Sequence, residues 1–147
     1  MPIGTDTFVR NFVAKNCRDV IDDVEKLDSI QDGFIHYQLI RFYQATRLQY
    51  MNSHIFLSNR SVLQQQHVDC KIADALLKKG TKQHADSWDA TSQAWAHMVL
   101  RLPHAEGGFG VIFNDVTKDT AFYTTTSRFV DWLGAFSQER QGHREIS

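Results

Sequence analysis

Residues 102–111, Leu102-Pro103-His104-Ala105-Glu106-Gly107-Gly108-Phe109-Gly110-Val111, interrupt a sequence whose apolar residues otherwise recur at helical spacing. Three of the four residues from 107 to 110 are glycines. Glycine adopts positive φ at little steric cost and lets another backbone approach closely. We therefore predict that Pro103, Gly107, Gly108 and Gly110 form a shaped structural turn between two helices, and not a slack linker.

Upstream of this turn, apolar residues at three- and four-residue steps predict three helices, over residues 5–27, 32–54 and about 59–79. Thr5, Asp6 or Thr7 would cap the first, and Gly80 would end the third. The second helix is apolar over a wide arc, so we expect it to be central and covered on more than one side. It carries two neighbouring apolar stripes. One comprises Ile35, Leu39, Phe42, Thr46 and Tyr50, and the other comprises Phe34, Ala45 and Leu48.

Downstream, Ser87 or Asp89 can cap a shorter helix that runs to Leu102, and Asn114 or Asp115 can cap a last helix through Leu133. Residues 138–147 are polar, and we expect them to form a frayed tail. The sequence therefore predicts one domain over residues 1–137. Its fold class is all-α, a bundle of about five helices with essentially no sheet.

The bulk composition is that of an ordinary globular domain. With 147 residues, the chain is long enough to bury about 70% of the surface that it exposes when unfolded. Its formal net charge of −1 gives no overall attraction to nucleic acid or to a membrane. Cys17 and Cys70 are interpreted as reduced, buried thiols. No signal peptide and no apolar run long enough to span a bilayer is present, so we expect an intracellular protein without a membrane partner.

No motif in the sequence identifies a cofactor, a metal site or a small-molecule substrate. His67 and Cys70 share a helical face, but zinc requires further ligands that the sequence does not supply. The glycine-rich segment is not a nucleotide loop, because a helix precedes it and no lysine follows. General acid–base chemistry could be assembled from histidines and carboxylates. The candidates are His84, His97 and His104 with Asp86 or Glu106.

Asp69 is the most informative polar residue. Its helical neighbours are Val62, Ile72, Ala73 and Leu76, so the pattern points its carboxylate inward. A buried carboxylate without a partner costs several kcal/mol.

Arg47 lies among aromatic residues of the preceding helix. We predict a structural ion pair between Arg47 and Asp69 that joins the second and third helices.

Positive charge gathers in two places that could contact phosphates. Arg10, Lys15 and Arg18 lie on the first predicted helix, and Lys78, Lys79 and Lys82 lie at and after the end of the third. These six residues are the candidate nucleic-acid contacts. A solvated helix surface would explain the same residues without a nucleic acid.

Several segments together resemble the region that follows the palm in non-LTR-retrotransposon-type reverse transcriptases. The resemblance covers roughly residues 2–136 and rests on segments that match the helical thumb and the elements after it. These segments are Pro2-Ile3-Gly4, Arg41, Arg47-Leu48-Gln49-Tyr50-Met51, Asp69, Leu102-Pro103, Gly107-Gly108-Phe109-Gly110-Val111 and a last helix that ends in a Trp.

The resemblance implies a thumb that grips the backbone of a primer–template. The family's metal-binding aspartates lie upstream in the palm, and no segment here resembles them. We therefore expect a non-catalytic fragment or degenerate reading frame with no polymerase activity alone. One alternative is a helical protein-interaction module that uses Trp88 or Trp95 and has no nucleic-acid role. A more distant alternative is a His/Asp hydrolase centred on His97 or His104.

Overall fold

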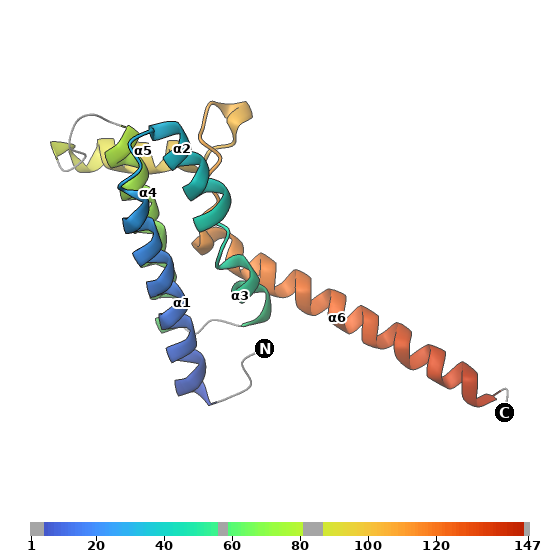
Figure 1. The fold of residues 1–147 in the computed structure, drawn as a ribbon. Helices are drawn as coiled ribbons and strands as arrows, with labels where there is room; N and C mark the ends of the chain where they lie inside the picture. The colour runs from blue at the N-terminus through green and yellow to red at the C-terminus, as the bar shows by residue number, and fades with distance from the viewer. Residues whose placement is uncertain (1–4, 56–58, 81–86, 146–147) are drawn as a thin grey trace.

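The computed structural model describes residues 5–55, 59–80 and 87–145. In these residues the chain is helical and contains no strand, which confirms the predicted all-α bundle of about five helices (Figure 1). Of the residues singled out above, Pro2, Ile3, Gly4, Lys82, His84 and Asp86 lie outside the described ranges.

Helices α1 (Asp6–Leu27) and α4 (Asn59–Gly80) pack side by side and form the centre of the bundle (Figure 1). They run in the same direction, because Lys79 at the end of α4 donates a hydrogen bond to the carbonyl of Asp28, which follows α1. Thr5 caps α1, since its side chain accepts from the N–H of Phe8. The core that these helices organise is apolar. It includes Val13, Val20, Val24, Ile40, Leu48, Val68, Ile72, Ala73, Leu100 and Phe113.

The second predicted helix is broken into three parts. These are α2 (Gly33–Leu39), a π-helical turn η1 (Ile40–Gln44) and α3 (Gln49–His54). The N–H of Ala45 donates to the carbonyl of Ile40 at 2.8 Å, a five-residue step that shifts the phase of the helix.

The first of the two predicted stripes is wrong, because Ile35, Leu39, Phe42 and Tyr50 are exposed. In the neighbouring stripe Ala45 and Leu48 are buried, whereas Phe34 is exposed. The buried side of this segment also carries the polar residues His36, Gln44 and Asn52, which hydropathy patterning does not count as core.

Asp89 caps helix α5 (Ala90–Arg101), since its side chain accepts from the N–H of Ser92 at 2.9 Å. A short 3₁₀ turn, η3 (His104–Glu106), and the glycine segment lead to α6 (Asn114–Glu145). Helix α6 packs on α3 and α4 near its beginning and then projects away from the bundle (Figure 1). The tail expected to fray from residue 138 continues this helix to Glu145.

Candidate functional site

The glycine segment forms a tight turn with the shape that its composition predicts. Gly107 and Gly110 have φ angles of 81° and 61°, in the left-handed region that favours glycine. A Cβ atom on Gly108 would lie 2.1 Å from the carbonyl oxygen of Leu102. The turn therefore requires glycine at 107 and 110 for conformation and at 108 for close backbone packing.

This turn folds back along the end of α5 and is fixed there by backbone hydrogen bonds. The N–H of Phe109 donates to the carbonyl of Val99 at 3.1 Å. From α2, the Tyr37 hydroxyl donates to the carbonyl of Phe109 at 2.5 Å. From the π turn, Arg41 Nε donates to the carbonyl of Gly110 at 3.2 Å. The two halves of the sequence are thus joined at the turn.

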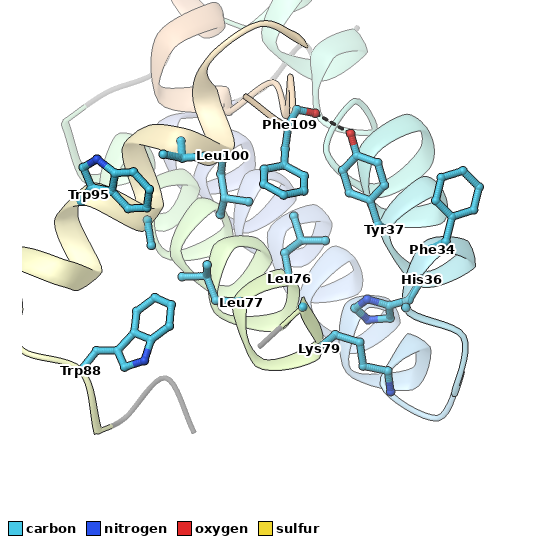
Figure 2. A pocket seen from close by; sticks show the side chains of 14 residues that line it. Phe34, His36, Tyr37, Leu76, Leu77, Lys79, Trp88, Trp95, Leu100 and Phe109 are labelled. Atoms are coloured by element: carbon cyan, nitrogen blue, oxygen red, sulfur yellow. Dashed lines mark hydrogen bonds between the residues drawn. The ribbon is translucent and has the colours of Figure 1, made fainter. Parts of the chain in front are cut away.

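The turn forms one wall of a pocket of about 460 Å³ between α2, α4 and α5 (Figure 2). The ring of Phe109 meets that of Tyr37 edge-on, with centroids 5.7 Å apart. Trp95 lies at the pocket with 63% of its surface exposed. The remaining lining is mostly apolar and includes Phe34, Leu76, Leu77, Trp88, Ala96, Val99 and Leu100. Pockets of this size with apolar walls and few polar groups are typical ligand sites.

His36 lies behind the pocket wall, which also includes Tyr37 and Lys79, and its side chain is completely buried. Neither ring nitrogen has a hydrogen-bond partner among the described residues. Its Nε2 atom lies 3.6 Å from Asp28 Oδ1, slightly beyond hydrogen-bond distance. Burial lowers the pKa of His36 below its ordinary value, and the nearby charge of Lys79 lowers it further, although Asp28 opposes both effects. At neutral pH the imidazole is therefore neutral and offers one donor and one acceptor.

Arg47 and Asp69 do not form the expected ion pair. Arg47 instead donates to Asp23 of α1 at the protein surface. Hydrogen bonds from Lys26 and from Arg47 hold the pKa of Asp23 below its ordinary value. A charged pair costs less desolvation at the surface than in the core, which is consistent with this arrangement.

Asp69 instead caps the beginning of α6. Its carboxylate accepts from the backbone N–H and the side-chain amide of Asn114, both at 3.0 Å, and from the N–H of Asp115 at 2.8 Å. Asn52 and Gln65 extend this buried polar network. Burial raises the pKa of Asp69 above its ordinary value and outweighs these hydrogen bonds, which lower it. Asp69 therefore acts as a structural acceptor that orients α6.

The five predicted nucleic-acid residues within the described ranges lie in two groups along α1 and α4. Arg10, Lys15 and Arg18 are exposed along α1. Lys78 and Lys79 lie beside Asp28, which follows α1, and are therefore roughly 15 Å from Arg18 and roughly 27 Å from Arg10 along the axis at ~1.5 Å per residue. Lys78 lies 3.6 Å from Asp28 Oδ2, and Lys79 donates to the Asp28 carbonyl at 2.7 Å.

The candidate acid–base residues are also separated. His97 Nε2 lies 4.0 Å from Asp74 Oδ1, whereas His104 Nε2 lies 3.4 Å from the Tyr37 hydroxyl.

Cys70 is exposed and not buried as expected. Cys17 is buried, and burial raises its pKa to about 11. Within the described ranges, no three His, Cys, Asp or Glu side chains are grouped so that they could hold a metal ion. None of the described helices is both long and apolar enough to cross a membrane.

Sequence reasoning named Trp88 and Trp95 but missed the pocket and His36. The only available signal was a histidine among apolar residues of a helix, which does not by itself indicate a site.

Comparison with protein-family profiles, with curated proteins and with solved structures found no match to this chain.

Proposed function

We propose that this chain is a non-catalytic helical module that resembles the thumb and downstream region of retroelement reverse transcriptases, and that it binds a protein partner through the aromatic pocket. The observation that carries the proposal is the pocket itself. It combines the exposed aromatic side chains of Phe34, Trp95 and Phe109 with a mostly apolar lining. Apolar surface that a partner removes from water contributes to affinity.

The pocket chemistry favours the side chain of a tryptophan or tyrosine. Its walls would contact the ring through Phe34, Trp95 and Phe109. Aromatic anchors that fill pockets are typical of the most strongly contributing residues at protein interfaces.

The distribution of charge favours a protein partner over a nucleic-acid backbone. Non-specific affinity for nucleic acid increases with the number of phosphates that basic side chains neutralise together. Here the five described candidates lie in two separate groups, and Lys78 and Lys79 are engaged with Asp28. The net charge of −1 adds no long-range attraction.

The segments on which the resemblance rests contact one another. Arg41 binds the glycine turn at Gly110, and Asp69 caps the helix that follows the turn. Segments that are distant in the sequence therefore form one structural unit.

The test is an NMR titration of the full chain with N-acetyl-tryptophanamide, a capped tryptophan. We expect shifts confined to Trp95, His36 and their neighbours, with a dissociation constant of about 1 mM, as for a small single-site ligand. Trp95→Ala should weaken binding about threefold to tenfold because it removes one aromatic wall. Tyr43→Ala is the matched control, since Tyr43 is also an exposed aromatic residue but does not line the pocket. Equal effects of the two variants, or no shifts at the pocket, would refute the proposal.

A second measurement separates the two candidate functions. Fluorescence anisotropy with an RNA–DNA hybrid at about 50 mM salt should give a dissociation constant weaker than about 100 μM, because few phosphates are contacted. Low-micromolar binding that is lost in the triple variant Arg10→Ala, Lys15→Ala, Arg18→Ala would instead favour contact with a nucleic-acid backbone.

A further inference from the structure

The projecting part of α6 carries a continuous apolar surface that the rest of the protein does not cover. Every residue from Thr126 to Ser137 is exposed. Phe129 and Trp132 are each 57% exposed, and Val130, Leu133 and Phe136 are exposed as well. Contiguous apolar surface of this kind on a folded protein marks an interaction site.

The spacing of this surface is that of a helix–helix contact. Phe122, Thr126, Phe129, Leu133 and Phe136 follow one another at alternating steps of four and three residues. This is the spacing of the a and d positions of a coiled coil, which place one stripe against a neighbouring helix. We call these five residues the α6 stripe.

Aromatic rings on the α6 stripe and beside it stack on one another. Trp132 stacks between Phe129 and Phe136, with ring centroids 6.1 and 5.4 Å apart and interplanar angles of 21° and 15°. Side chains that are fixed before association lose less conformational entropy when they are buried in an interface. The surface is therefore arranged for contact with little rearrangement.

We infer that α6 pairs with α6 of a second copy of this chain through the α6 stripe. The charge pattern supports self-association. Between residues 122 and 137 the only charged residues are Arg128 and Asp131, and both lie off the stripe and its flanking positions. Two identical stripes can therefore meet without burying an unpaired charge or opposing like charges.

The available area is sufficient for a specific contact. The exposed parts of Phe129, Trp132 and Phe136 amount to about 300 Å² in each copy, taking ~200 Å² for an aromatic side chain. With Tyr123, Val130 and Leu133 added, two copies would bury on the order of 1,000 Å². This reaches the lower limit for specific interfaces and predicts a reversible dimer that forms at micromolar concentrations or above.

The test is sedimentation equilibrium of the full chain from about 5 to about 200 μM, where a reversible dimer changes its mass with concentration. The mass should rise from 16.9 kDa toward twice that value. Phe129→Glu places like charges in the paired stripes and should weaken dimerisation about 100-fold. Leu63→Glu is the control, because Leu63 is an equally exposed apolar residue on α4. It should leave dimerisation unchanged.

Three outcomes would overturn the inference. These are a constant mass of 16.9 kDa, an effect of Leu63→Glu equal to that of Phe129→Glu, and a mass that rises without a plateau at the dimer. Circular dichroism checks that Phe129→Glu keeps its helix content. The result is independent of the pocket titration, since Phe129 does not line the pocket.

Discussion

Replacement of Asp69 tests whether a single buried carboxylate holds α6 in place. Asp69→Ala leaves three donors without an acceptor, namely the backbone N–H and side-chain amide of Asn114 and the N–H of Asp115. Asn114 is buried, and each buried donor that loses its partner costs ~1–3 kcal/mol. We expect Asp69→Ala to lower the free energy of unfolding by about 3–5 kcal/mol, a large share of the stability of an ordinary domain.

Asp69→Asn separates the acceptor from the charge. Asparagine keeps one oxygen, which can still serve the two Asn114 donors, but its amide then faces the N–H of Asp115. The raised pKa of Asp69 shows that burial already offsets much of the benefit of the negative charge. We therefore expect Asp69→Asn to cost only about 1 kcal/mol, the value of one hydrogen bond.

Urea unfolding followed by circular dichroism measures both variants. Asp74→Ala is the control, because Asp74 is an exposed acid on the same helix and should change the free energy of unfolding by less than about 0.5 kcal/mol. If Asp69→Ala behaved like Asp74→Ala, the capping interpretation would fail. If Asp69→Asn cost as much as Asp69→Ala, the charge and not the acceptor geometry would hold α6.

Three further predictions concern the turn and the pocket. Gly108→Ala should cost at least about 2 kcal/mol in urea unfolding, because its Cβ would overlap the Leu102 carbonyl. Tyr37→Phe should cost about 1 kcal/mol in the same assay, because it removes the hydrogen bond to Phe109. For His36, the lowered pKa means that the unfolded chain binds the proton more tightly, so stability falls as pH drops below 6.5 toward the folded-state pKa. We therefore expect the thermal unfolding temperature of His36→Gln to fall less with decreasing pH below 6.5 than that of the unchanged protein.

Matched controls exist for two of these variants. Gly33→Ala should be tolerated, since a Cβ there meets no atom within 4 Å. Tyr43→Phe should be neutral, since Tyr43 is exposed. If Gly108→Ala lowers the free energy of unfolding no more than Gly33→Ala does, the interpretation of the turn is wrong. If Tyr37→Phe lowers it no more than Tyr43→Phe does, the Tyr37 hydrogen bond contributes no stability. A pH profile for His36→Gln identical to that of the unchanged protein would assign the acid sensitivity to other groups.

Apolar spacing was sufficient to predict the helices but not the buried side of the segment from 32 to 54. Helices α1, α4 and α5 begin and end close to the predicted residues, because caps and glycines act locally. The prediction for residues 32–54 was wrong, because the π turn changes the phase of the helix and because His36, a polar residue, is buried. Neither event leaves a signal in the apolar pattern of a single sequence.

The partner of Asp69 was likewise outside the reach of pattern reasoning. The sequence correctly indicated an inward carboxylate, and Arg47 was the conspicuous cation nearby in the chain. The partner that the structure supplies is the beginning of α6, which lies 45 residues downstream of Asp69. A helix N-terminus can satisfy a carboxylate as well as a cation can, since its free N–H groups carry partial positive charge.

The glycine turn links the pocket to the projecting helix. It places Phe109 in the pocket wall through bonds to Val99 and Tyr37, and four residues after Gly110 the chain enters α6 at the Asp69 cap. The pocket and the α6 stripe therefore share one rigid connection, anchored from α2 and the π turn on one side and from α4 on the other. A substitution that strains this connection should disturb both surfaces together, whereas substitutions on either surface should act alone.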